Sequence, residues 1–127
     1  MAPDKVRVLL VDDEPSIVKT VSKRLEVAGF DVIVAVTGEE AITKALTERP
    51  NAIVLDLMLP TISGMQVCET LKKDQRCKDI PVVVMFTGKG DEADEERCRN
   101  VGAAAYVTKT QGSAELISQL KALLGSA

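Results

Sequence analysis

The sequence predicts an α/β fold, a single doubly wound five-stranded parallel sheet with five helices on its two faces, as a three-layer sandwich. Two observations predict it. Apolar runs of strand length alternate along the whole chain with stretches of helical periodicity. The runs are continuously apolar, as is typical of parallel strands buried on both faces. The length of 127 residues fits one domain over residues 1–127, with a structured core over about 5–124.

Five short apolar runs, rich in β-branched residues, predict the strands. They cover residues 6–11, 31–36, 52–55, 81–86 and 104–107. Proline occurs in one of them, as Pro81, at the first position, where the missing N–H is tolerated. The even spacing of the runs leaves room for one helix after each strand.

Start and stop signals predict the first two helices. Pro15 opens a pattern with apolar residues on one face, and Gly29 stops it. Residues 37–40 have the pattern of a capping box, in which Thr37 and Glu40 satisfy each other's backbone N–H groups. The helix that follows is expected to end before Pro50.

The other three helices are predicted from different signals. Ser63 is expected to cap a third helix, and a polar fourth helix is expected over about 91–101, ending at Gly102. Ser113 is expected to cap the last helix. The residues expected to point inward from that helix are Leu116, Ile117, Leu120, Leu123 and Leu124.

The composition excludes several kinds of chemistry. The chain has no histidine, which excludes Ser-His-Asp and Cys-His catalysis by this chain alone and any zinc site that uses histidine. A net charge of −3 does not favour nucleic acid or an anionic membrane as a direct ligand. Cys68, Cys77 and Cys98 form no C-x-x-C pair and are expected to be reduced thiols.

Neither a signal-peptide pattern nor a run of about 20 apolar residues is present in the sequence. We therefore expect a cytoplasmic protein without a membrane partner. The leucine-rich last helix could pair with a second copy of the chain, but packing against the core explains its apolar face equally well.

Polar residues that could bind ligands or take part in a reaction follow the predicted strands. Asp12 and Asp13 follow the first strand, Asp56 the third, Thr87 the fourth and Lys109 the fifth. Ligands of an open parallel sheet bind beyond the carboxyl ends of its strands. Taken singly, the groups could cap a helix, start a turn or be solvated. Taken together, they predict one functional edge of the sheet.

The chemistry of these groups points to phosphoryl transfer. Crowded carboxylates repel one another unless they protonate or bind a cation, and oxygen ligands suit Mg²⁺. One carboxylate can then act as a nucleophile toward phosphorus. Thr87 and Lys109 can hold phosphoryl oxygens by hydrogen bonding and charge.

Four segments carry a family resemblance, namely Val8–Pro15, Leu55–Pro60 with Gly64, Phe86–Gly88 and Tyr106–Lys109. With these segments the chain resembles, over essentially its whole length, the receiver domain of two-component response regulators. The resemblance implies a flavodoxin-like fold with strand order 2-1-3-4-5.

The resemblance also implies roles for the acidic residues. Asp56 corresponds to the phosphoacceptor, supplied by a sensor histidine kinase or a histidine phosphotransfer protein. Asp12 and Asp13 correspond to the acid pair that binds Mg²⁺ or Mn²⁺, together with Asp56 and the backbone carbonyl of Met58. The chain would assist its own phosphorylation and dephosphorylation without being an enzyme for a separate substrate.

Three further residues are implied to form the switch. Thr87 corresponds to the switch hydroxyl, Lys109 to the phosphate-binding lysine, and Tyr106 to an aromatic residue that turns inward in the active state. An equally good interpretation of Tyr106 is a half-buried strand residue. The face of the fourth helix, fifth strand and fifth helix would then change its affinity for a downstream protein that the sequence does not identify.

The sequence departs from the family pattern at two positions. Gly88 follows the switch hydroxyl, where the family often has alanine. Thr110 follows the lysine, where the family usually has a proline, often with a cis peptide bond. A cis bond before a non-proline residue costs about 2.5–4 kcal/mol, so we expect a trans bond at Thr110.

Other functions fit the sequence less well. Residues 88–93 match the dinucleotide pattern G-x-G-x-x-G/A, but they follow the fourth strand rather than the first, and acids surround them. A phosphorylation-independent pseudo-receiver that binds a protein is a second class. A Mg-dependent phosphatase with an aspartate nucleophile is a remote third, because the D-x-D-x-[TV] motif is missing after the first strand.

Overall fold

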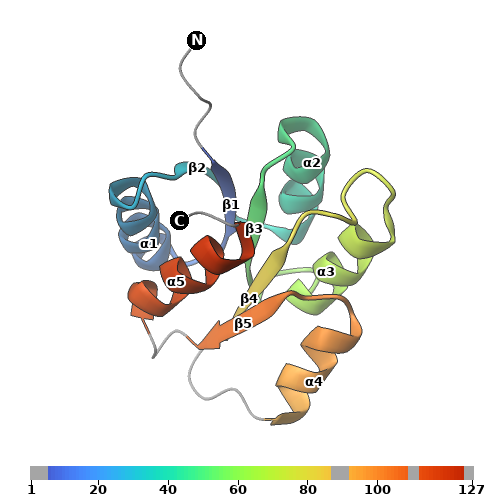
Figure 1. Ribbon diagram of the computed structural model, residues 1–127. Coiled ribbons are helices and arrows are strands. Elements are labelled where there is room, and N and C mark those ends of the chain that lie inside the picture. Colours follow the sequence, from blue (N-terminus) through green and yellow to red (C-terminus); the bar gives the residue numbers. More distant parts are fainter. Residues whose placement is uncertain (1–5, 87–91, 109–111, 125–127) are drawn as a thin grey trace.

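The computed structural model describes residues 6–86, 92–108 and 112–124, in which strands and helices alternate from β1 to α5 (Figure 1). The elements are β1 Arg7–Val11, α1 Pro15–Val27, β2 Asp31–Ala35, α2 Gly38–Glu48, β3 Ala52–Asp56, α3 Gly64–Lys73, β4 Val82–Phe86, α4 Glu92–Asn100, β5 Ala105–Thr108 and α5 Gly112–Leu124. The predicted alternation is confirmed, and every predicted strand boundary lies within one residue of the observed one.

The strands form one parallel sheet in the order β2-β1-β3-β4-β5. This order confirms the expectation drawn from the family resemblance. In the register, Val11 of β1 is paired with Ala35 of β2 and with Leu55 of β3. The carboxyl ends of these three neighbouring strands therefore lie together at one edge of the sheet.

Helices cover both faces of the sheet, α1 and α5 on one face and α2, α3 and α4 on the other (Figure 1). Successive strand residues point to opposite faces, and each face has its own buried core. Leu9 and Val11 belong to the core beneath α2, α3 and α4, whereas Val8 and Leu10 belong to the core beneath α1 and α5. The three-layer sandwich is thus confirmed.

The cap of α2 differs in part from the prediction. Thr37 accepts a hydrogen bond from the Glu40 N–H at 3.1 Å, as expected. The carboxylate of Glu40, however, accepts from the N–H of Val36 at 2.7 Å, and not from that of Thr37. It also forms an ion pair of 3.0 Å with Lys44. Glu40 therefore fixes the residue before the cap, and the reciprocal half of the expected capping box was wrong.

Two predictions for the last helix were also wrong. The helix α5 begins at Gly112, so Ser113 lies within its first turn and does not cap it. Leu123 was expected to point inward but is 36% exposed, while Leu116 and Leu120 are fully buried. Leu123 is seven residues after Leu116 and so lies on the same face of α5, but it stands in the last turn of the helix. The cap prediction for α3 was correct, because Ser63 and Gln66 form a complete capping box.

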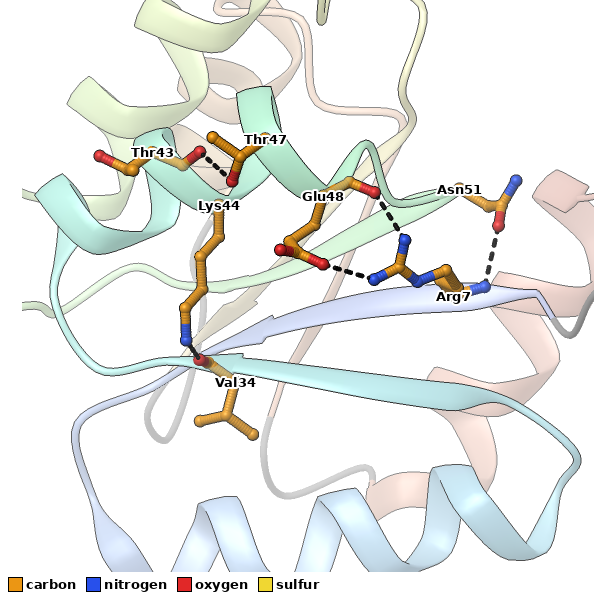
Figure 2. Close-up of polar contacts among 7 residues, drawn as sticks. All are labelled: Arg7, Val34, Thr43, Lys44, Thr47, Glu48 and Asn51. Carbon is orange, nitrogen blue, oxygen red and sulfur yellow. Dashed lines mark hydrogen bonds and ion pairs between the residues drawn. The ribbon is translucent and has the colours of Figure 1, made fainter.

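The carboxyl end of α2 is fastened to the beginning of β1 (Figure 2). The guanidinium of Arg7 donates to the Glu48 carbonyl at 2.8 Å and to the Glu48 carboxylate at 2.7 Å. The backbone of Arg7 exchanges two hydrogen bonds of 2.8 Å with Asn51. A guanidinium at a helix carboxyl terminus also interacts favourably with the helix dipole. One turn before that end of α2, the Lys44 amine donates to the Val34 carbonyl of β2 at 2.6 Å.

None of the described helices has the length and apolarity required to cross a membrane.

Candidate functional site

Three carboxylates meet at the carboxyl edge of the sheet. Asp12 follows β1, Asp13 comes next, and Asp56 is the last residue of β3. One ligand oxygen from each lies within 4.8 Å of the others. Asp12 and Asp56 are 1% and 3% exposed, while Asp13 is exposed. The predicted convergence of these three acids is therefore confirmed, and it follows from the parallel order of β1 and β3.

Backbone amides hold the two buried carboxylates in place. The Asp12 carboxylate accepts from the Glu14 N–H at 3.0 Å, and the Asp56 carboxylate accepts from the Met58 N–H at 3.2 Å. Each acid thus accepts from the amide two residues farther along the chain, as short acidic side chains do in Asx turns. The Asp12 N–H donates to the Ala35 carbonyl at 3.1 Å, which ties the first acid to β2 as well.

The loop after Asp56 returns closely over the end of β3. The Gly64 N–H donates to the Leu57 carbonyl at 2.9 Å. A Cβ atom at Gly64 would collide with the Asp56 carbonyl oxygen and would lie 2.9 Å from the Leu57 Cα. Only glycine permits this approach of the two backbones. The presence of Gly64 in the family resemblance therefore has a steric reason at the site.

The donor set fits Mg²⁺. Mg²⁺ prefers oxygen ligands and commonly takes one or two carboxylates along with other oxygens. Two carboxylates out of contact with water beside a third one repel each other, and a divalent cation relieves that repulsion. Asp12, Asp13 and Asp56 are the residues that would hold it. The Met58 side chain is 68% exposed, and the contribution of its carbonyl stays a prediction.

Two of the predicted site residues, Thr87 and Lys109, lie outside the described residues, as do Gly88 and Thr110. The strands that precede the first two end at Phe86 and Thr108, which are paired in the register of β4 and β5. The roles predicted for the hydroxyl and the amine stay predictions.

Tyr106 lies in β5, opposite Val84 of β4, and is half-buried. It packs against the core beneath α2, α3 and α4. It also lines an open cavity of about 250 Å³ together with Cys98, Arg99 and Gln119, between α4, β5 and α5. The position is compatible with both interpretations of this residue given above.

The three cysteines are free and buried, in keeping with the expected reduced thiols. Burial raises the pKa of the Cys68 thiol to about 11, and its sulfur donates to the Val101 carbonyl at 3.7 Å. Burial also raises the pKa of Cys77. Reactive cysteines have lowered pKa values, so these two thiols are structural.

One contact near the site, between Thr61 and Glu39, could not be predicted from the sequence. Thr61, in the loop between β3 and α3, donates to the carboxylate of Glu39 in the first turn of α2, with oxygen–oxygen distances of 2.9 and 3.0 Å. The two residues are 22 positions apart, and no periodic or motif signal links them.

Among curated proteins, relatives of this chain are transcriptional regulators. It is 42% identical over 118 residues to the alkaline phosphatase synthesis transcriptional regulatory protein PhoP of Bacillus subtilis, covering 93% of this chain and 48% of PhoP. The same values hold for the DNA-binding dual master transcriptional regulator RpaA of Synechocystis. The chain thus spans about half the length of these relatives.

Solved structures match the chain over nearly its full length. A putative response regulator from Chloroflexus aurantiacus has a TM-score of 0.90 at 27% identity, covering 96% of this chain and 99% of the other. The chemotaxis response regulator CheY4 of Vibrio cholerae has a TM-score of 0.88 at 28% identity, with 95% and 100% covered.

A third structure is the receiver domain of the sensor histidine kinase PA1611 from Pseudomonas aeruginosa, with a magnesium ion coordinated in its active site cleft. Its TM-score is 0.87 at 26% identity, with 97% of this chain and 100% of the other covered. The family model of the response regulator receiver domain matches residues 8–121. A match of that extent shows that the chain belongs to the receiver domain family of two-component response regulators.

Proposed function

We propose that Asp56 accepts a phosphoryl group from a phosphohistidine, and that Asp12, Asp13, Asp56 and the Met58 carbonyl hold the Mg²⁺ or Mn²⁺ ion that the reaction requires. The observation that carries the proposal is the convergence of three carboxylates within 4.8 Å, two of them buried at the ends of neighbouring strands. A receiver domain that had lost this function would have no reason to retain mutually repelling buried acids.

The position of Asp56 in the sheet supports its role as the acceptor. Its strand, β3, is the central one in the order β2-β1-β3-β4-β5. On one side lies β1, which leads into Asp12 and Asp13. On the other side lies β4, which precedes Thr87 in the sequence. Asp56 is thus the acid between the cation-binding pair and the strand that leads to the switch hydroxyl.

In the proposed transfer, a carboxylate oxygen of Asp56 attacks the phosphorus of the phosphohistidine. The new P–O bond forms as the P–N bond breaks, and the electron pair of that bond stays on the leaving imidazole, which takes up a proton. A bound divalent cation supplies charge neutralisation at the phosphoryl oxygens. Because the chain has no histidine, the donor belongs to another protein or another segment, a sensor histidine kinase or a histidine phosphotransfer protein.

The response to the modification is proposed to be conformational. The added negative charge draws Thr87 and Lys109 toward the phosphoryl group and biases an equilibrium that the free domain already samples. The face of α4, β5 and α5 around Tyr106 then changes its affinity for a protein partner, a second copy of the chain included. We propose that residues 1–127 act in this way as one receiver domain in the cytoplasm, without direct contact to nucleic acid or membrane.

Intact mass measurement tests the acceptor. The protein is incubated with Mg²⁺ and a small acyl phosphate. We expect the gain of one phosphoryl group, lost in Asp56→Asn and in the presence of EDTA. Asp31→Asn is the matched control, because Asp31 is an exposed aspartate at the beginning of β2, at the opposite edge of the sheet. Absence of any gain in the folded protein would overturn the proposal in favour of a phosphorylation-independent binding module.

The response of the output face has its own test. Phosphorylation of the wild-type protein is expected to shift the amide NMR signals of β5 around Tyr106 in addition to those around Asp56. Shifts confined to the acidic site would show that Asp56 and the output face are not coupled.

A further inference from the structure

The loop between β3 and α3 is linked to the first turn of α2 by a side-chain contact. The hydroxyl of Thr61 lies 2.9 and 3.0 Å from the two carboxylate oxygens of Glu39. The carbonyl oxygen of Pro60, 2.6 Å away, competes for the same proton. A carboxylate is the stronger acceptor, so the interaction with Glu39 connects the loop to a different element of the fold.

The backbone at Thr61 needs such a support. Its φ of 64° lies in the left-handed region, which is an outlier for a β-branched residue. Residues persist in such conformations where the surrounding structure holds them, and they gather at functional sites. Glu39 supplies a hold on Thr61 from outside the loop.

A second contact lies directly beside the first. Gly38, the residue before Glu39, is buried, and a Cβ atom there would collide with Ile62, the residue after Thr61. That atom would also lie 2.8 Å from the Val67 side chain on α3. Two consecutive residues of α2 therefore touch two consecutive residues of the loop, so the first turn of α2 fixes the loop in both position and direction.

This loop begins at the acidic site. The Met58 N–H donates to the Asp56 carboxylate, and the Gly64 N–H donates to the Leu57 carbonyl, so both of these bonds lie within the segment from β3 to α3. The Leu57 N–H ties the start of the loop to the Met85 carbonyl of β4 at 3.0 Å, and the contact with Glu39 ties the middle of the loop to α2. We propose that Glu39 and Thr61 are positioning residues that hold the Met58 carbonyl in place for the divalent cation. The inference rests on the proposed function, which places that carbonyl among the ligands.

The test is a Mg²⁺ titration of the metal-free protein, followed through the amide NMR signals of the acidic site. Thr61→Val removes the hydroxyl and keeps the branched shape, and Glu39→Ala removes the acceptor. We expect each to weaken Mg²⁺ affinity by about three- to tenfold, at or below the usual loss when an outer-sphere partner of a metal site is removed. Thr61→Ser and Glu39→Gln keep a donor and an acceptor and are expected to stay within about twofold of the wild type.

The conservative variants separate hydrogen bonding from charge. Glu39→Gln and Glu39→Ala both lose one negative charge, so equal losses of affinity would mean that Glu39 acts only through its charge and would overturn the inference. Glu69→Ala is a further control, because Glu69 is an exposed acid of α3 whose partner is Lys73. The double variant with Thr61→Val and Glu39→Ala is expected to lose no more affinity than either single one.

A second readout does not depend on the metal. In EDTA, hydrogen exchange at the amides of Met58, Leu59, Thr61 and Ile62 is expected to quicken in Thr61→Val and Glu39→Ala, while the thermal midpoint of the domain changes little. Wild-type affinity and exchange in Thr61→Val would overturn the inference and leave the role of Asp56 intact. If the wild-type protein itself shows no Mg²⁺-dependent shifts, and Asp12→Asn changes nothing, the proposed function fails first.

Discussion

Asp12 and Asp56 each follow one member of a residue pair in the sheet, because Val11 of β1 is paired with Leu55 of β3. The parallel register thus brings two carboxylates together at buried positions, with Asp13 beside them. Folding has to overcome their repulsion when no cation is bound. The stability of the domain should therefore depend on divalent cations and on the charge at this site.

Asp12→Asn is expected to stabilise the metal-free protein by about 1 kcal/mol, because it removes one of the repelling charges. The asparagine oxygen can still accept from the Glu14 N–H, so the local turn is kept. Saturating Mg²⁺ at about 100 times its dissociation constant should stabilise the wild type by about 2.7 kcal/mol, and Asp12→Asn much less. Urea denaturation with Mg²⁺ or EDTA measures both effects. A metal-free variant less stable than the wild type would contradict the expected repulsion.

Lys72 and Lys73 are neighbours on α3, and their substitution is expected to affect stability to different extents. The Lys72 amine donates to the carbonyls of Lys78 and Ile80 at 3.1 and 2.6 Å, and burial lowers its pKa. Lys73→Met is the matched control, because the Lys73 side chain is 75% exposed and its ion-pair partner among the described residues is Glu69. Lys72→Met should lower the free energy of unfolding by about 2 kcal/mol and Lys73→Met by at most about 0.5 kcal/mol. Equal losses in urea denaturation would show that the two carbonyls need no amine.

The buried thiol of Cys68 predicts a loss of stability in alkali. Its pKa rises from 9.0 to about 11 because of burial. The native state therefore keeps the proton at a pH where the unfolded chain has lost it. The stabilisation is fully present below pH 9.0 and is lost as the pH rises toward about 11, with a loss from this group of about 3 kcal/mol.

Urea denaturation across that pH range measures this loss. The comparison is with Cys68→Ala, whose overall stability is lower but whose decline should be shallower. An identical decline in the two proteins would exclude Cys68 as its source.

Arg49 ends α2 in the left-handed conformation, with φ 50° and ψ 61°. A non-glycine residue in this conformation is strained by about 1–2 kcal/mol. Glycine avoids the strain, but it loses more conformational entropy on folding, which offsets part of the gain. Arg49→Gly should therefore stabilise the domain by about 0.5–1 kcal/mol. Thr47→Gly, two residues earlier and within the helix, should destabilise it by about 0.5 kcal/mol. Thermal denaturation of the pair checks the opposite signs.

The strands and the acidic cluster could be predicted from the sequence for a physical reason. Residues 8–11 and 52–55 are continuously apolar because parallel strands are buried on both faces, and the acids follow where that burial ends. Parallel strand direction then brings Asp12 and Asp56 to one edge without any knowledge of side-chain packing.

Other features depend on packing between elements and carry no local pattern. The Glu40 carboxylate accepts from the Val36 N–H rather than from that of Thr37, and this depends on the path of the chain from β2 into α2. Leu123 shares a helix face with the buried Leu116 but is exposed in the last turn of α5, and the apolar pattern alone does not show how far along the helix the core extends. The contact between Glu39 and Thr61 joins two segments whose distance is determined only in the folded molecule.

The helix α2 is held at both ends, by Arg7 at its carboxyl terminus and by Thr61 at its amino terminus. Its 11 residues span about 16 Å, from the amino edge of the sheet to the carboxyl edge. One residue inserted into or deleted from the helix would turn one end about 100° relative to the other, so one of the two attachments would break. The length of α2 is therefore constrained as strictly as its sequence, and variation in length belongs in the turns on either side of it.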